Sequence, residues 1–138
     1  MSVYAVIDTN VLVSAVLKPS SVPSRVIEHA LSGKIIPLFN DEILAEYREV
    51  LGRKKFGFPQ PQVEALLNSI TSRGRLVGVK DFECALPDPK DKVFYCVLMT
   101  AREDTEAYLV TGNLKHFPQK IFVVTPREIL DILEAEDD

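Results

Sequence analysis

Short runs of β-branched and other apolar residues alternate with longer amphipathic stretches along the chain, and this alternation constrains the fold more than any other feature. The first run, Val3 to Ile7, is nearly all apolar, as expected for a central parallel strand covered on both faces. Strands that alternate with helical segments are typical of α/β proteins, so we predict an α/β fold with five parallel strands. The predicted strands lie at 3–7, 35–39, 76–79, 108–111 and 121–124.

The amphipathic stretches predict helices between these strands. The clearest start is Thr125-Pro126-Arg127-Glu128, which places a hydroxyl at the N-cap, proline at N1 and glutamate at N3, the pattern of a capping box. Residues 93–99 form an unbroken apolar run that fits a buried strand or a buried helix, and the preceding Asp88-Pro89 favours the helix. The predicted helices lie at about 22–33, 41–54, 61–73, 90–103 and 126–136.

The bulk composition limits the class of protein. A chain of 138 residues fits one domain, which we expect to span residues 1–138. No apolar stretch approaches the roughly 20 residues of a membrane span, and the first residues lack the basic segment of a signal peptide, so we expect no membrane association. Cys84 and Cys96 form no CxxC pair and no disulfide framework, which favours a cytoplasmic location.

The net charge of -4 argues against a general electrostatic grip on nucleic acid, because Lys and Arg supply phosphate affinity. It does not exclude a nuclease. A site built from several carboxylates is acidic by necessity, and a bound divalent cation reverses the local field toward phosphate.

Polar residues follow two of the predicted strands, and ligands of open parallel sheets bind beyond the carboxyl ends of the strands. Asp8 ends the first run, where a charge is costly unless it is paired or metal-bound. Its alternative role is the N-cap of a helix that begins near Val11. Thr111-Gly112-Asn113 follows the fourth strand and brings a hydroxyl and an amide to the same edge, although these residues also suit an ordinary turn.

Glu46 is the acid best placed on the helix predicted at 41–54. At about 100° per residue it lies at the margin of the apolar face, whereas Glu42 and Glu49 point further toward solvent. The alternative is an exposed acid in an i,i+3 or i,i+4 charge pattern.

Asp88 and Asp91 precede the apolar helix predicted at 90–103. Asp88 suits an N-cap best, while Asp91 on the first turn, facing the strand ends, can both start the helix and ligate a metal. The candidate ligands therefore come from four elements, and their hard oxygen atoms suit Mg²⁺ or Mn²⁺ and not zinc. They are Asp8, Glu46, Asp91 and Asn113.

In the order and spacing of these segments the chain resembles the PIN-domain family, which includes the VapC-like toxin ribonucleases of toxin-antitoxin modules. The segments are Val6-Ile7-Asp8-Thr9-Asn10, Glu46 within residues 44–51, Asp88-Pro89-Lys90-Asp91-Lys92, and residues 108–113. The resemblance implies a three-layer α/β/α sandwich around five parallel strands and metal-dependent hydrolysis of RNA. It also implies a homodimer and, if the chain is a toxin, a cognate antitoxin as partner.

By position in that resemblance, Asp8, Glu46 and Asp91 look like the three acidic metal ligands and catalytic residues. Asn113 stands where the family often carries aspartate, which would weaken a second metal. Thr111 and Asn10 are expected to orient the carboxylates through hydrogen bonds. A last group of residues is a candidate for contact with the RNA backbone or, one by one, for plain solvated charge, and it comprises Arg53, Lys54, Lys55, Lys115 and His116.

Two other functions are compatible with the pattern. A PIN-like scaffold that binds RNA or a protein, with weak or no nuclease activity, fits the asparagine at 113. An acid-cluster phosphotransfer domain, such as a receiver or a haloacid-dehalogenase-like phosphatase, fits less well, because Asp8 is followed by Thr-Asn without a second aspartate two residues on.

Overall fold

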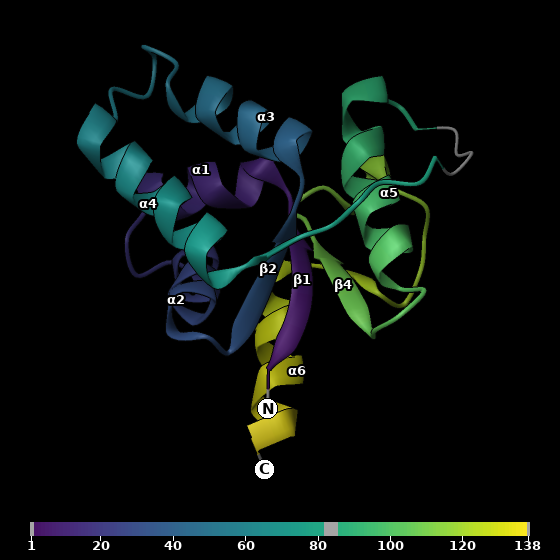
Figure 1. The fold of residues 1–138 in the computed structure, drawn as a ribbon. Coiled ribbons are helices and arrows are strands. Elements are labelled where there is room, and N and C mark those ends of the chain that lie inside the picture. Colours follow the sequence, from purple (N-terminus) through teal and green to yellow (C-terminus); the bar gives the residue numbers. More distant parts are fainter. Residues whose placement is uncertain (1, 82–85, 138) are drawn as a thin grey trace.

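The computed structural model describes residues 2–81 and 86–137, and in these residues one sheet of five parallel strands organises the chain. The strand order is β3-β2-β1-β4-β5, which puts β1 at the centre. In Figure 1, α1 to α4 lie on one side of β1 and β2, and α5 lies beyond β4 on the other. The predicted α/β/α sandwich and its five parallel strands are confirmed. The strands are β1 (Val3–Ile7), β2 (Ile35–Phe39), β3 (Arg75–Leu76), β4 (Ala107–Val110) and β5 (Val123–Val124).

The two edge strands are shorter than predicted. The strand that pairs with β2 covers Arg75 and Leu76, and the Val77 amide adds one 2.8 Å hydrogen bond to the Phe39 carbonyl. The apolar run continues to Val79, but Leu76 is already 63% exposed. At the other edge, Ile121 was predicted to be in a strand but is 94% exposed, and pairing begins at Val123. An edge strand has one neighbour, so β propensity without burial does not extend it.

The predicted helices are present. Two predictions were too long by more than one residue: the helix expected to reach residue 54 ends at Leu51, where Gly52 caps it, and the helix expected at 90–103 covers Lys92–Ala101. One further helix, α1, had no predicted range and was foreseen only as the helix near Val11 that Asp8 could cap, since its consecutive apolar residues show little helical periodicity. The helices are α1 (Thr9–Leu17), α2 (Val22–Ser32), α3 (Asp41–Leu51), α4 (Gln60–Arg73), α5 (Lys92–Ala101) and α6 (Pro126–Asp137).

The capping box that starts α6 forms as predicted. The backbone amide of Glu128 donates to the Thr125 hydroxyl at 3.1 Å, and the Thr125 amide donates to the Glu128 carboxylate at 2.9 Å. The apolar run of residues 93–99 is helical, preceded by a short 3₁₀ turn, η1 (Pro89–Asp91). The start of α6 is thus set by local side-chain chemistry.

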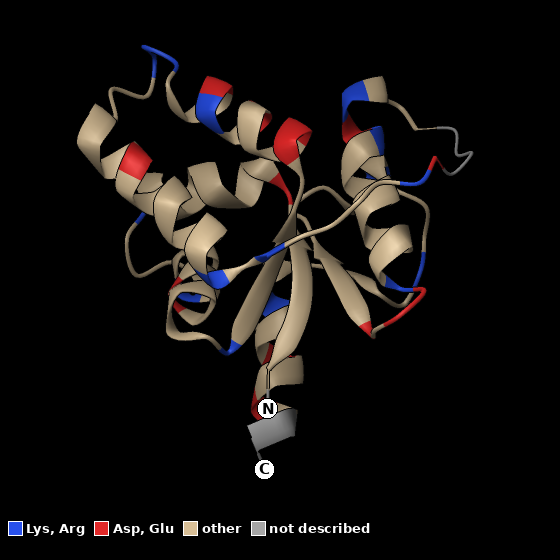
Figure 2. Cartoon of the chain, in the orientation of Figure 1, with Lys and Arg blue, Asp and Glu red and all other residues tan. Residues whose placement is uncertain are grey.

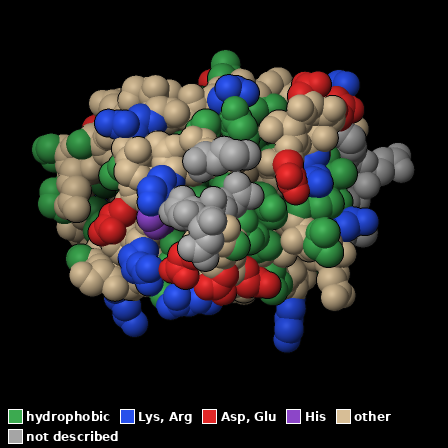
Figure 3. Space-filling view, turned by 90° about the horizontal axis from the view of Figure 1, so that it is seen from below, with side chains coloured by type: hydrophobic (Ala, Val, Ile, Leu, Met, Phe, Trp, Pro, Cys, Tyr) green, Lys and Arg blue, Asp and Glu red, His purple; other side chains and the backbone are tan. Residues whose placement is uncertain are grey.

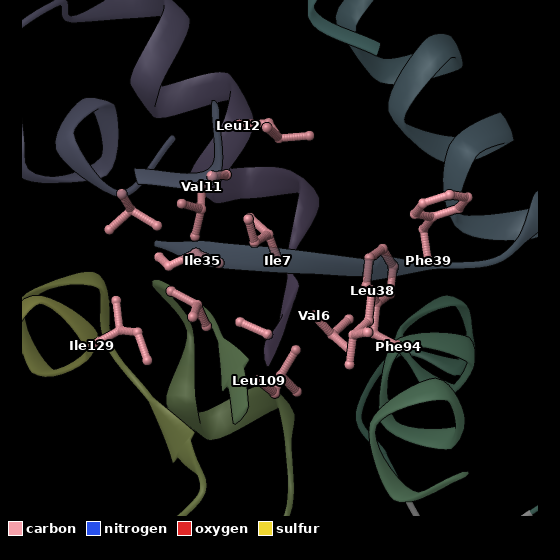
Figure 4. Close-up of a cluster of buried hydrophobic side chains, with 14 of the residues drawn as sticks. Val6, Ile7, Val11, Leu12, Ile35, Leu38, Phe39, Phe94, Leu109 and Ile129 are labelled. Carbon is pink, nitrogen blue, oxygen red and sulfur yellow. The ribbon is translucent and has the colours of Figure 1, made fainter. Parts of the chain in front are cut away.

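The core lies on both faces of β1 and is drawn in Figure 4. Val6 and Leu109 belong to adjacent strands, Phe94 packs on them from α5, and Ile129 joins from α6. The face seen in Figure 3, at the amino ends of the strands, mixes charged side chains of both signs with hydrophobic ones. Among the described residues no helix is long and apolar enough to cross a bilayer. Cys96 is buried on α5, and Cys84 lies outside the described residues.

Candidate active site

A cavity of about 430 Å³ opens at the carboxyl edge of the sheet, where β1, β4, α3 and the start of α5 come together. Its lining includes all four residues predicted as ligands, which are Asp8, Glu46, Asp91 and Asn113. Asn10 and His116 also line it. The structure therefore brings together side chains that are separated by up to 105 positions in the sequence.

Asp8 is the most buried acid of this cavity, at 6% exposed. Its Oδ2 accepts a 2.8 Å hydrogen bond from the Thr111 hydroxyl. The pKa of Asp8 is raised to about 6, chiefly by burial and in addition by the charges of Asp91 and Glu46, while hydrogen bonds from Thr111 and from the Thr9 backbone oppose the rise. Although Asp8 is the N-cap residue of α1, its side chain makes no capping hydrogen bond, so the alternative role is not the one it fills.

Glu46 reaches the cavity from α3. Its side chain is half-buried, whereas Glu42 and Glu49 are exposed, in agreement with the helical wheel. The Thr9 hydroxyl donates a short hydrogen bond to Glu46 Oε2 and so ties α1 to α3 at the cavity. The next residue, Tyr47, is buried, and its hydroxyl donates to the Ile7 carbonyl at 2.5 Å. That bond anchors α3 to the end of β1, one residue before Asp8.

Asp91 lies at the start of α5, and His116 contacts it from the segment after β4. His116 Nδ1 is 3.1 Å from Asp91 Oδ2. Partial burial raises the pKa of Asp91, the Asp88 charge adds to the rise, and the contact with His116 opposes it. Asp88 caps the 3₁₀ turn, because its carboxylate accepts a 3.0 Å hydrogen bond from the Lys90 amide. This confirms the capping role that we favoured for Asp88.

The loop after β4 is held by hydrogen bonds to its own residues and to α1. The Thr111 hydroxyl, while donating to Asp8, accepts from the Asn113 amide at 2.9 Å. Asn10 Oδ1 accepts from the Gly112 amide at 3.3 Å. Thr111 thus contacts a carboxylate as expected, and Asn10 acts on the loop that carries Asn113.

The basic residues that were candidates for RNA contact differ in their position relative to the acidic cavity, and some of them do not line it. Arg53 lines the cavity and pairs with Glu49 at 3.0 Å. Lys54 and Lys55 are exposed in the turn after α3, where Figure 2 shows Lys and Arg gathered. Lys115 lines a separate hollow beside Phe117 and Lys120, so the structure does not bring it to the carboxylates.

The donor set fits a hard divalent cation in its chemistry. Asp8, Glu46 and Asp91 offer carboxylate oxygens to one cavity. Burial raises the pKa of Asp8 most, and the repulsion from the other two carboxylates, which adds to that rise, is the kind a divalent cation neutralises. As placed, the carboxylates contact Thr111, Thr9 and His116, and within the described residues no three His, Cys, Asp or Glu side chains enclose a metal position.

Two site contacts were not foreseen from the sequence. In the sequence Thr9 stands out only as the residue after Asp8. Glu46 is 37 positions away, and no local pattern predicts the hydrogen bond between the two side chains. His116 was a candidate for contact with the RNA backbone or for plain solvated charge, and its contact with Asp91 was not predicted. The link between His116 and Asp91 depends on the approach of the segment after β4 to the start of α5, which local sequence does not encode.

Comparison with known proteins identifies a family for the chain. A family model described as PIN domain matches residues 4–115, which include Asp8, Glu46, Asp91 and Asn113. No curated protein and no solved structure matches the chain.

Proposed function

The chain belongs to the PIN-domain family, and from this membership and its acidic cavity we propose that it is a metal-dependent endoribonuclease. The observation that carries the proposal is the convergence of Asp8, Glu46 and Asp91 on one cavity at the carboxyl edge of the sheet. Carboxylates that repel one another are expensive to keep together without a cation. The presence of three carboxylates in one cavity is therefore better explained by cation binding than by a contribution to the free energy of folding.

The residues have distinct roles in this proposal. When bound, Mg²⁺ or Mn²⁺ would acidify a water and neutralise charge on the phosphate. Asp8 and Asp91 would hold the cation, and Asn113 would contribute a carbonyl oxygen. Glu46, fixed by Thr9, would share in holding it or accept the proton of the water that attacks phosphorus as the bond to the leaving oxygen breaks. Thr111 keeps Asp8 in one orientation through its 2.8 Å hydrogen bond.

The biological setting of the proposal rests on the resemblance. We propose a cytoplasmic toxin of a toxin-antitoxin module, which would act on RNA as a homodimer and be inhibited by a cognate antitoxin. We also propose that residues 1–138 form a single domain, because Ile129, Leu130 and Leu133 of α6, beyond the family match, belong to the same core as β1.

A binding scaffold with weak or no catalysis is the second candidate. It is favoured by Asn113, which stands where aspartate is frequent in the family. It is also favoured by the contacts of the three carboxylates, which lie against Thr111, Thr9 and His116 and, within the described residues, do not enclose one shared position. In this alternative the same cavity would bind RNA or a protein without hydrolysing phosphodiesters.

The test is hydrolysis of a mixed RNA sample with Mg²⁺ or Mn²⁺ by the parent chain and by Asp8→Asn, Glu46→Gln and Asp91→Asn. Each substitution removes one charge with little change in volume, and we expect each to lower the rate by at least about 100-fold, as for loss of a group that acts in the transition state. Glu42→Gln makes the same chemical change one turn earlier on α3, outside the cavity, and should leave the rate unchanged.

Equal rates in the parent and the three cavity variants would refute the catalytic assignment. Calorimetric titration with Mn²⁺ separates the two candidates further. If the chain is a ribonuclease of this kind, the parent binds Mn²⁺ and Asp8→Asn binds it more weakly. A scaffold that does not bind the cation cannot catalyse the metal-dependent reaction.

A further inference from the structure

The turn between α3 and α4 carries an aromatic pair next to the acidic cavity. The rings of Phe56 and Phe58 stack with centroids 5.3 Å apart and an interplanar angle of 8°. Phe58 packs against the core, whereas within the described residues Phe56 is not among the partly buried hydrophobic side chains that do so. Phe56 instead lines the cavity that contains the carboxylates. Phe58 therefore holds the Phe56 ring in place by stacking, and packing in the core does not explain why Phe56 is half-buried.

Phe56 follows the C-terminal end of α3, the helix that carries Glu46. Glu46 and Val50 line the cavity from the same face of α3, and four residues advance the helix axis by about 6 Å. The helix ends at Leu51, and the lining continues with Arg53 and Phe56. A group held at Phe56 would thus belong to a part of the substrate next to the reacting phosphate and not to the reacting phosphate itself.

Positive charge accompanies this ring in a chain whose net charge is -4. Arg53, Lys54 and Lys55 immediately precede Phe56, and Figure 2 shows this turn as a local concentration of basic residues. Basic side chains that follow a backbone, together with aromatic rings on which bases stack, are the means by which proteins bind single-stranded nucleic acid.

Lys55 also covers Phe56 in the absence of RNA. Its ammonium lies 5.1 Å from the centroid of the Phe56 ring, and the Lys55 side chain is exposed. An exposed cation–π contact changes an equilibrium constant by about 2- to 5-fold, while stacking of a base changes it by about 5- to 100-fold. Stacking of a base therefore replaces the contact between the Lys55 ammonium and the Phe56 ring. The ammonium can then pair with a phosphate of the RNA.

We propose that Phe56 is a stacking site for an unpaired base adjacent to the cleaved phosphate. The inference rests on the proposed ribonuclease function. A duplex keeps both faces of each interior base inside its own stack, so it cannot offer a base to Phe56 without being opened. The cavity would consequently take single-stranded segments in preference to paired ones.

The chain contains no tryptophan, which supplies a spectroscopic test. Phe56→Trp introduces a sole indole whose fluorescence a stacked base quenches. The matched control is Phe122→Trp, because Phe122 is also half-buried with a cation, Arg102, 3.9 Å from its ring, and does not line the cavity. Both are made in the Glu46→Gln background to slow cleavage, and each is titrated with Mg²⁺ present against a short oligoadenylate and against an RNA duplex of equal length.

We expect the oligoadenylate to quench Phe56→Trp and not Phe122→Trp, and the duplex to quench neither. Equal quenching by duplex and single strand would overturn the proposal, as would binding of the labelled oligoadenylate, seen by anisotropy, without quenching. Cleavage of RNA by the parent in either case would leave the ribonuclease function standing. Quenching without cleavage by the parent would support the base site while refuting the nuclease.

A second measurement avoids the introduced indole. Phe56→Leu keeps apolar volume but removes the aromatic face, and it should weaken binding of labelled oligoadenylate by about 5- to 100-fold. Phe122→Leu should change the dissociation constant by less than about 2-fold. Equal dissociation constants for the parent and Phe56→Leu would overturn the proposal even if the quenching result were ambiguous.

Discussion

Thr111 and Asp8 are joined by a 2.8 Å hydrogen bond between the ends of two adjacent parallel strands, although they are 103 positions apart in the sequence. Both side chains are buried, so the hydroxyl is a donor that water does not readily replace. The bond favours the charged form of Asp8 and opposes the rise in pKa that burial causes. It therefore sets both the orientation and the protonation of the acid at the centre of the proposed site.

Thr111→Val should raise the pKa of Asp8 above its present value of about 6, because it removes a hydrogen bond to the carboxylate while keeping the side-chain shape. We expect the acid limb of the pH profile of RNA cleavage to move to higher pH, and the free energy of unfolding to fall by about 1–3 kcal/mol. Thr111→Ser keeps the hydroxyl and should retain the parent profile. An unchanged profile in Thr111→Val would show that the hydroxyl does not act on Asp8.

Asp8→Asn should stabilise the cation-free protein at neutral pH. A pKa raised from 3.8 to about 6 means that the folded state holds the proton more tightly than the unfolded state. The stability from Asp8 is therefore fully present below about pH 3.8, is lost as the pH rises through about 6, and amounts to about 3 kcal/mol. Asparagine does not titrate, so the variant avoids this loss.

The measurement is denaturant unfolding in EDTA at about pH 5 and about pH 7.5, values that lie below and above the folded-state pKa. The other acids titrate in both proteins, so the difference between parent and variant reports Asp8 together with its electrostatic coupling to Asp91 and Glu46. The gain in stability should be larger at the higher pH. A gain that is equal at both values would contradict the raised pKa.

The sequence predicted the parts of the site that obey local rules. Asp8 ends a strand and Glu46 sits on the margin of a helix face, and periodicity locates both. The α/β fold followed from the alternation of runs and the three-layer sandwich from the family resemblance, yet Leu76 and Ile121 show that apolar composition does not fix where an edge strand ends. The pairing of Thr9 with Glu46 and of His116 with Asp91 depends on how elements meet in space, and no local pattern carries that information.

Tyr47→Phe should lower the free energy of unfolding by about 1–2 kcal/mol, because it leaves the Ile7 carbonyl unpaired in the core. Burial raises the pKa of Tyr47, so its hydroxyl remains a donor across the working pH range. Tyr4→Phe is the control, since the Tyr4 hydroxyl accepts an exposed 3.3 Å hydrogen bond from Arg75 and its loss should cost less than about 0.5 kcal/mol. Urea unfolding measures both. Equal losses would mean that the Tyr47 bond does not anchor α3.

Asn113→Asp should strengthen binding of a second cation, because it adds a carboxylate to a cavity that already contains Asp8, Glu46 and Asp91. Affinity for hard cations rises with the charge of the ligand set, and we expect calorimetry with Mn²⁺ to show binding on the order of 10-fold tighter or a higher stoichiometry than in the parent. In EDTA at neutral pH the same change should lower stability, since a fourth acid adds repulsion that nothing neutralises.

Asn68→Asp supplies the matched control for this last substitution. Asn68 is exposed on α4 and does not line the cavity, so the variant adds the same charge without adding a ligand. Faster RNA cleavage in Asn113→Asp, together with tighter Mn²⁺ binding and no change in Asn68→Asp, would indicate that asparagine at this position limits the parent to weak second-cation binding. If Asn113→Asp binds Mn²⁺ no better than the parent, the side chain at 113 does not contribute to the cation site, and the three acids alone must account for any activity.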